Sequence, residues 1–197
     1  MTSANVHYRE IRPGPTMKEN ASILTQLRID CGWNADAVPG WILDIERGYR
    51  LIWFIYNQPY RQPTNPMNVR LPIGMISLCL YDPKDPTLAN IAAQDDSIRG
   101  RRAEVSSLFV YPDYRRRGVG KGAIDYVEEM AAQRGVDTVT MNTDAAGTNL
   151  EIYLKMGYQE YKPREKKWPL DEVQTLGFTE EHCWAAFLEK RLEHMWI

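Results

Sequence analysis

The chain has 197 residues, of which 44% are hydrophobic and 25% are charged, and its formal net charge is -2. This length fits one domain, and the composition supplies enough apolar residues for a sizeable core. The slight acidic balance argues against a general nucleic-acid binder, because such proteins usually carry a basic surplus. A polyanionic ligand would therefore have to bind at a local basic patch.

Cysteine usage and hydropathy bear on the compartment. Cys31, Cys79 and Cys183 are odd in number and widely spaced, which indicates reduced thiols and gives no metal-binding pattern. The first 14 residues contain no apolar core of a signal peptide. The longest apolar run, LIWFIY at 51–56, is far shorter than the ~18 residues of a membrane span. We therefore expect a cytoplasmic protein, with the nucleus as the alternative, and expect no metal and no membrane partner.

The first half of the chain alternates strand and helix patterns. Strands are predicted from residues that favour strands and from Pro-Gly punctuation, and helices from apolar residues at helical spacing. A proline-rich hairpin or loop is expected at 58–66, and a long, mobile polar excursion at 82–102. The predicted elements are strands at 6–14, 50–57 and 70–81 and helices at 17–33 and 37–48.

The second half has a regular strand–helix rhythm. Strands are predicted at 103–111, 136–143 and 158–163, helices at 118–135 and 148–157, and either a strand or a helix at 182–192. Two strand–helix–strand units in succession predict a partly parallel sheet with helices packed on it. The fold class is α/β or α+β, in one domain over residues 1–197. In the helix at 118–135, one apolar face is formed by Val119, Ala123, Tyr126, Val127 and Met130.

A basic, glycine-rich turn follows the strand at 103–111. The stretch YPDYRRRGVGKGAID (111–125) gathers four cations, Arg115, Arg116, Arg117 and Lys121. The first N–H groups of a helix have no internal partner, and the helix dipole adds positive charge there. Glycines at 118, 120 and 122 allow an anion to approach the backbone closely. The turn therefore predicts a site for a pyrophosphate or an equally anionic group, with a solvated basic loop as the alternative.

Two common nucleotide motifs do not fit this turn. A Walker-type loop requires Ser or Thr after Gly-Lys, but Gly122 follows Lys121. The spacing of Gly118, Gly120 and Ala123 matches the dinucleotide fingerprint, and an acidic residue, Asp144, lies downstream. That fingerprint runs directly from the strand into its first glycine, whereas PDYRRR intervenes here. The remaining ~75 residues are also too few for the second half of a doubly wound sheet.

A third motif fits. Residues 115–120, RRRGVG, resemble the R/Q-x-x-G-x-G/A phosphate loop of the GNAT N-acetyltransferases, which bind acetyl-coenzyme A (acetyl-CoA). Residues 103–135 are similar to the family's fourth strand, phosphate loop and third helix, and IYLKMGYQEY (152–161) to its closing helix and strand. The similarity covers about residues 73–162; over the first 60 residues it depends on the order of elements alone. It implies a mixed sheet, splayed between its fourth and fifth strands, with flanking helices.

The resemblance also implies where the coenzyme binds. The backbone of Leu108, Phe109 and Val110 is expected to hold the pantetheine arm. The pyrophosphate is expected at the amides of residues 117–121, with two arginines flanking it; this set comprises Arg115, Arg116, Arg117, Gly118, Val119, Gly120 and Lys121. Many relatives carry an asparagine seven residues before the catalytic tyrosine, where this chain has Ala146. Asn149, four residues before the tyrosine, either caps the short helix or reaches the coenzyme.

Two catalytic residues follow from the same resemblance. Tyr153 matches the family tyrosine that donates a proton or a hydrogen bond to the departing sulfur; the alternative is a core aromatic. Glu104 lies on the fourth strand, where several members place a glutamate base, and an ion pair with Arg101 or Arg102 is the alternative. The histidines lie outside the motifs, although His182 could reach the site.

The resemblance implies that the acceptor pocket is built by the first helices, the loop that connects them and the late strands. Aromatic and acidic residues there suit a cationic amine, although tryptophans on such helices are usually core. We predict an acetyl-CoA-dependent N-acetyltransferase in which a primary amine, small molecule or peptide, attacks the thioester directly. The alternative is a non-catalytic acetyl-CoA sensor or scaffold; the sequence leaves a homodimer open. The candidate pocket residues are Trp33, Trp41, Trp53, Tyr56 and Tyr60, with Asp30, Asp36, Asp44 and Glu46.

Overall fold

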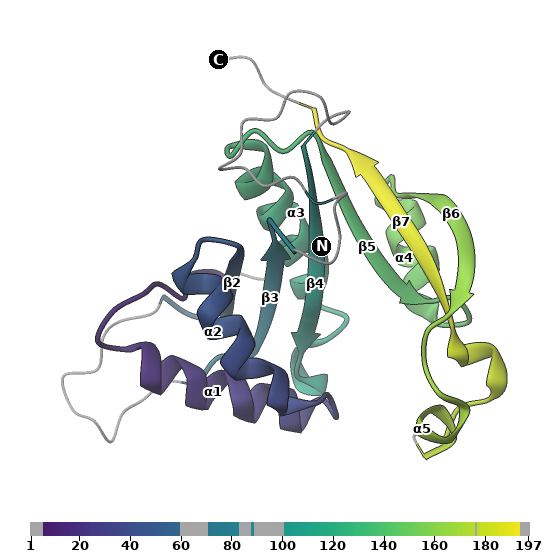
Figure 1. Ribbon diagram of the computed structural model, residues 1–197, viewed down its shortest axis with the longest axis horizontal. Coiled ribbons are helices and arrows are strands. Elements are labelled where there is room, and N and C mark those ends of the chain that lie inside the picture. Colours follow the sequence, from purple (N-terminus) through teal and green to yellow (C-terminus); the bar gives the residue numbers. More distant parts are fainter. Residues whose placement is uncertain (1–5, 60–70, 83–87, 89–100, 176, 194–197) are drawn as a thin grey trace.

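The centre of the structure is one seven-stranded sheet with the strand order β1-β2-β3-β4-β5-β7-β6 (Figure 1). The structure is a computed structural model, and it describes residues 6–59, 71–82, 88, 101–175 and 177–193. The strands are β1 (His7–Glu10), β2 (Arg50–Tyr56), β3 (Gly74–Cys79), β4 (Arg102–Val110), β5 (Thr138–Asp144), β6 (Gln159–Lys166) and β7 (Trp184–Arg191). The helices are α1 (Met17–Asp30), α2 (Val38–Glu46), α3 (Val119–Ala132), α4 (Thr148–Lys155) and α5 (Leu170–Thr175).

The strands and helices predicted from the pattern are present close to their expected bounds. The segment 182–192, left open between strand and helix, forms strand β7. Helix α5 and a 3₁₀ turn at Glu180–Cys183 were not predicted, because this stretch is polar and α5 buries only Val173 among its described residues. Most of the loop at 58–66 and of the excursion at 82–102 lies outside the described residues.

The sheet opens between β4 and β5. These two strands are parallel, and their register covers only Arg102↔Thr138, Ala103↔Val139 and Glu104↔Thr140. Beyond Glu104 they diverge, which is visible in Figure 1 as the widening gap between them. The remaining neighbours in the sheet are antiparallel, since β7 inserts between β5 and β6. The predicted splay between the fourth and fifth strands is confirmed, and the parallel part of the sheet is shorter than the two strand–helix–strand units suggested.

A β-bulge in β4 lies at the splay. Ser106 pairs with Ser77 and Phe109 with Met75, so two residues of β4 oppose one of β3. Ser107 within the bulge has a φ of 56°, which is unusual for a residue other than glycine. A bulge shifts the alternation of side chains by one residue. Glu104 and Ser106 therefore share their face of the sheet with Phe109.

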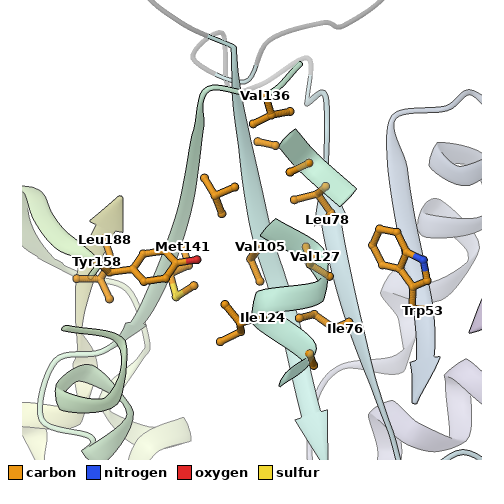
Figure 2. Close-up of a cluster of buried hydrophobic side chains, with 14 of the residues drawn as sticks. Trp53, Ile76, Leu78, Val105, Ile124, Val127, Val136, Met141, Tyr158 and Leu188 are labelled. Carbon is orange, nitrogen blue, oxygen red and sulfur yellow. The ribbon is translucent and has the colours of Figure 1, made fainter. Parts of the chain in front are cut away.

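Two apolar clusters cover the two faces of the sheet. One packs α3 on the strands, with Val105, Ile124, Val127 and Met141 near its centre (Figure 2). The other packs α1 and α2 on β2 and includes Phe54. The buried face of α3 is formed by Val119, Ala123, Ile124, Val127, Glu128 and Ala131. Tyr126 and Met130, predicted on this face, pack only at its margin.

A carboxylate is buried within the α3 cluster. Glu128 is 9% exposed and accepts hydrogen bonds from the Tyr158 hydroxyl (2.8 Å) and the Lys190 ammonium (2.6 Å). This network ties α3 to the strands beyond the splay. No helix among the described residues is long and apolar enough to cross a membrane.

Candidate active site

A cleft of about 720 Å³ occupies the splay between β4 and β5. On the α3 face it is lined by Ile124, Asn149 and Tyr153, and on the opposite face by α1, α2 and the connection from β6 to β7. In Figure 1, α2 and α5 lie on the two sides of the gap between the β4 and β5 ribbons. Four of the predicted site residues line the cleft: Glu104, Leu108, Asn149 and Tyr153. The phosphate-loop residues, Phe109 and Val110 are not part of this lining.

The start of α3 has the geometry of an anion site. Gly118 precedes the helix with a φ of 81°, and no side chain in the described part of the chain caps it. The first bond inside the helix runs from the Gly122 N–H to the Gly118 carbonyl (2.9 Å), so the N–H groups of the first turn have no intrahelical acceptor. A Cβ at Gly120 would meet only a Leu108 methyl carbon, at 3.9 Å. These open N–H groups fit the phosphate role expected of residues 117–121.

The basic residues of the loop also have local partners. The Arg115 Nε donates to the Val110 carbonyl (2.8 Å), which ties the loop to the end of β4. The Arg117 guanidinium lies 5.9 Å from the centre of the Tyr114 ring. Lys121 pairs with Asp125 at 2.5 Å. Arg115 therefore shapes the loop as well as adding charge to it.

The β4 edge next to the cleft fits the expected pantetheine site. Phe109 and Val110 pair with Met75 and Gly74 of β3, and their side chains are buried. On the other edge, the register with β5 ends at Glu104. Among the described residues, no β5 partner covers the later part of β4. Backbone groups there are available to the amides of an extended ligand.

Glu104 is held by a polar network across the cleft. Asn142 of β5 donates to its carboxylate (2.7 Å), and the Lys167 ammonium donates to the Asn142 side-chain oxygen (2.6 Å). Desolvation lowers the pKa of Lys167, and the nearby Glu104 opposes that effect. Arg102, named as an alternative partner of Glu104, forms its ion pair with Glu189 (2.6 Å). The network fixes the Glu104 carboxylate at the mouth of the splay.

Tyr153 lies on the opposite face of the cleft. Its ring packs edge-on against Tyr158, with centroids 6.2 Å apart, and burial raises the pKa of its hydroxyl. The hydroxyl therefore stays protonated near neutral pH and can donate a hydrogen bond. Among the described residues none accepts one from it, which leaves this donor available to a ligand.

Asn149 does not cap its helix. The N-cap of α4 is Gly147, and no side chain caps the helix start, so the capping alternative is wrong. Asn149 instead lies on the exposed surface of the first turn and lines the cleft.

The face of the cleft opposite α3, which we call the acceptor face, differs from the acidic, aromatic pocket predicted from sequence. Trp33 and Trp41 line the cleft, whereas Trp53 and Tyr56 are core residues, each 1% exposed. Tyr60 lies outside the described residues. None of the four predicted acids lines the cleft; Asp30, for example, accepts hydrogen bonds from Tyr111 and Gln26. This part of the prediction is wrong, because those acids lie elsewhere on α1, α2 and the turn between them.

Other polar residues that the sequence analysis did not assign to the acceptor face line it. Among them are Arg28, Arg50, Asn142, Asp144, Lys167, Glu172 and His182. His182, which we expected to be able to reach the site, forms a hydrogen bond of 2.5 Å between its Nδ1 and the Asp144 carboxylate. The alternation of TVTMNTD along β5 could have identified Asn142 and Asp144, since a strand exposes every second residue on one face. No local pattern indicates Arg28 and Arg50, because folding alone brings them together.

Comparisons with known proteins agree with this geometry. No curated protein matches the chain by sequence. Among solved structures, Arabidopsis thaliana NAA60 in complex with acetyl-CoA is similar with a TM-score of 0.63 and 17% identity, over 95% of this chain and 99% of that chain. The ribosomal-protein-S18-alanine N-acetyltransferase from Escherichia coli is similar with a TM-score of 0.58 and 12% identity, over 95% of each chain.

An aminoglycoside 6'-acetyltransferase of type Ii has the same fold, with a TM-score of 0.58 and 15% identity, over 94% of this chain and 97% of that chain. At these identities the structures establish the fold alone. The sequence model of the acetyltransferase (GNAT) family matches residues 41–158, which is more than half of the chain. That segment contains the phosphate loop, the splay and Tyr153. The chain therefore belongs to the GNAT family of acetyltransferases and uses acetyl-CoA as its cosubstrate.

Proposed function

We propose that this acetyltransferase transfers the acetyl group to a primary amine, which attacks the thioester directly. One observation carries the proposal: Tyr153 and Glu104, from opposite faces of the sheet, line a single cleft. A thioester threaded between β4 and β5 would present its sulfur to one face and its carbonyl carbon to the other. An amine on the acceptor face then needs no covalent enzyme intermediate.

The backbone is proposed to bind the coenzyme. The open N–H groups at the start of α3 suit the pyrophosphate, and the part of the β4 edge that no described strand covers suits the pantetheine amides. Arg115, Arg116 and Arg117 add positive charge beside this site. The bound cosubstrate supplies an acetyl group activated as a thioester. What the chain adds is the position of that group relative to Glu104 and Tyr153.

Glu104 is proposed to take the proton that the attacking amine loses. Its carboxylate is oriented by Asn142, and its cross-strand neighbour on β3 is Cys79. A general base must lie within hydrogen-bond reach of the proton it removes, directly or through one water. Glu104 lies in the cleft wall where the two strands part, and this position supports the proposed role for an amine bound on the acceptor face.

Tyr153 is proposed to stabilise the departing sulfur. An unperturbed tyrosine near pKa 10 facing a thiol near pKa 8.5 makes complete proton transfer uphill by about 2 kcal/mol. Burial raises the pKa of Tyr153 further, which makes early transfer less favourable still. A hydrogen bond that strengthens as negative charge develops on sulfur is the more effective contribution.

We also infer that residues 1–197 form a single domain in the cytoplasm or nucleus. One sheet takes strands from His7 to Arg191, which supports the single domain. All three cysteines are free thiols, as is usual in a reducing compartment.

Acetyl transfer to a panel of amines and peptides tests the proposal. Release of the coenzyme thiol should be slow with acetyl-CoA alone and should rise with the amine concentration, with the acetylated amine as product. Tight acetyl-CoA binding with no transfer to any acceptor would favour a sensor or scaffold instead. Thiol release that does not depend on any amine would contradict the proposal.

A further inference from the structure

Two arginines stack on one tryptophan in the acceptor face of the cleft. The guanidinium carbons of Arg28 and Arg50 lie 4.3 Å and 4.8 Å from the centre of the Trp41 ring. Arg28 comes from α1, Trp41 from α2 and Arg50 from the start of β2, and all three line the cleft. Three separate elements thus gather two positive charges at one point.

Both arginines are largely removed from water. Arg28 is 8% exposed, and the Arg50 side chain is 13% exposed. Desolvation is the main cause that lowers the pKa of Arg28, and the nearby Arg50 adds to it. A buried charge is costly unless an opposite charge or several hydrogen bonds satisfy it.

The described residues supply one carboxylate for these two cations. Asp44 lies 3.6 Å from the Arg50 Nε, and Arg50 also donates to Ser77 (2.8 Å) and Ser106 (3.0 Å). Arg28 donates through Nε to the Asn34 carbonyl (2.6 Å). None of the described residues accepts a hydrogen bond from its two terminal nitrogens. These two nitrogens form a fork without a partner among the described residues on a side chain that lines the cleft, a geometry that matches a carboxylate.

The arginine pair lies close to the proposed base. Ser106, which binds Arg50, is two residues beyond Glu104 on the same face of β4, a spacing of about 7 Å along a strand. Glu104, Asp144 and Glu172 line the same cleft. The cleft thus holds an acidic group suited to an amine, Glu104, about 7 Å along the strand from the serine that binds Arg50.

We propose that the acceptor is an α-amino acid, whose carboxylate binds Arg28 and Arg50 while its amine faces Glu104. This rests on the proposed function and specifies its substrate class. In the reaction, the C–N bond forms at the acetyl carbonyl and the C–S bond breaks. The amine proton goes to Glu104, and the coenzyme leaves as a thiolate that accepts a hydrogen bond from Tyr153 and then takes up a proton from water to become the thiol. The product is an N-acetyl amino acid, which keeps its carboxylate on the arginines until release.

Matched acids and amides test this inference. Each standard α-amino acid is compared with its own carboxamide, which keeps the amine and the side chain but lacks the anion. For the best pair, the wild type should show kcat/KM about 10- to 100-fold higher for the acid, the effect of one charged hydrogen bond. Arg28→Gln should remove most of that preference, mainly by raising KM for the acid. Arg28→Lys should keep part of the preference, because the lysine ammonium retains the positive charge but lacks the planar fork of arginine.

Arg47→Gln is the control, since Arg47 is an exposed residue at the end of α2 and does not line the cleft. It should leave the preference unchanged. Thermal melting checks that each variant folds. If Arg28→Gln does not fold, the inference is tested by the preference for the acid over the amide in the wild type and by the reduction of that preference in Arg28→Lys. Equal or better use of the amides by the wild type would overturn the inference while leaving acetyl transfer intact.

A binding measurement separates this inference from the proposed function. Calorimetry with coenzyme A present compares an N-acetyl amino acid with its N-acetyl amide, and needs no turnover. Tighter binding of the acid by the wild type, lost in Arg28→Gln or weakened in Arg28→Lys, supports the carboxylate site even if no amine is acetylated. Equal binding of acid and amide across the series overturns it.

Discussion

Gly118 and Gly120 have different reasons to be glycine. Gly118 has a φ of 81°, a conformation that side chains with a Cβ rarely adopt. Gly120 has helical geometry, and a Cβ there would make one ordinary contact with Leu108. The space beside Gly120 is thus open to a ligand, and a substitution there acts on binding rather than on the backbone.

Gly120→Asp should abolish coenzyme binding and leave the fold nearly intact. The new carboxylate enters the site where the first-turn N–H groups are proposed to hold the pyrophosphate, and like charges repel there. Titration calorimetry with acetyl-CoA measures the effect. Gly120→Ala is the control; it should bind with an affinity closer to that of the wild type, since the methyl group has room. Unchanged affinity in the Asp variant would show that the phosphates bind elsewhere.

Tyr153→Phe should slow turnover without weakening coenzyme binding. The ring and its packing against Tyr158 remain, and the hydroxyl contributes only once charge develops on sulfur. A loss of ~10²-fold in kcat, or about 3 kcal/mol, is expected for a hydrogen bond of this kind. Single-turnover kinetics must accompany the steady-state rates, because product release could mask the step. An equal loss of acetyl-CoA affinity would mean that the hydroxyl is structural.

At the scale of single elements, the buried carboxylate of α3 connects the helix to β7. Burial and the neighbouring Glu128 both raise the pKa of Tyr158, which keeps this hydroxyl a donor at any moderate pH. Glu128 accepts from two donors, whereas Tyr158 and Lys190 each give one of these bonds. Removing the acceptor should therefore cost more stability than removing the tyrosine donor.

Glu128→Gln should lower the free energy of unfolding by about 2 kcal/mol, and Tyr158→Phe by about 1 kcal/mol. The amide of Gln has nearly the volume of the carboxylate, but its NH₂ group faces one of the two donors. In Tyr158→Phe, Glu128 keeps its bond with Lys190. Urea denaturation of each variant gives both values. A larger loss in Tyr158→Phe than in Glu128→Gln would contradict the central place given to the carboxylate.

The elements with a clear period were predictable from sequence. Hydrophobic spacing located α3, and the run of glycines after a strand located the open N–H groups at its start. The binding of a pyrophosphate there stays a prediction. The acceptor face was not predictable, because it depends on residues that are distant in the chain. Arg28 and Arg50 have no shared local pattern, and the acids predicted for the acceptor pocket lie outside the cleft. Helix α5 was missed because its polar sequence buries one described residue.

At the scale of the whole molecule, the sheet consists of two parts joined over a short length. Strands β1 to β4 form one part and β5, β7 and β6 the other, and the β4–β5 register ends at Glu104. A ligand that spans the splay would contact both parts. Such a ligand stabilises the native state by mass action, by about 2.7 kcal/mol at a hundred times its Kd.

Coenzyme A should therefore slow hydrogen exchange at two places, the start of α3 and the second half of β4. Hydrogen-exchange mass spectrometry with and without the ligand measures both. Adenosine 5'-diphosphate is the control, since it carries the pyrophosphate without the pantetheine arm. It should protect the start of α3 and leave β4 unchanged. Protection of neither segment by coenzyme A would place its site outside the splay.

The insertion of β7 between β5 and β6 has a consequence for synthesis on the ribosome. Strand β5 pairs with β7 from Thr138↔Arg191 to Asp144↔Ala185, partners that lie 53 to 41 residues later in the chain. Until those residues emerge, β5 can pair only with the first residues of β4, and its apolar side chains, Val139 and Met141, lack part of their cover. Contacts of such long sequence separation form late. The nascent chain thus completes the phosphate loop well before the far wall of the cleft, so it should be exposed to chaperones and proteases until the last strand is in place.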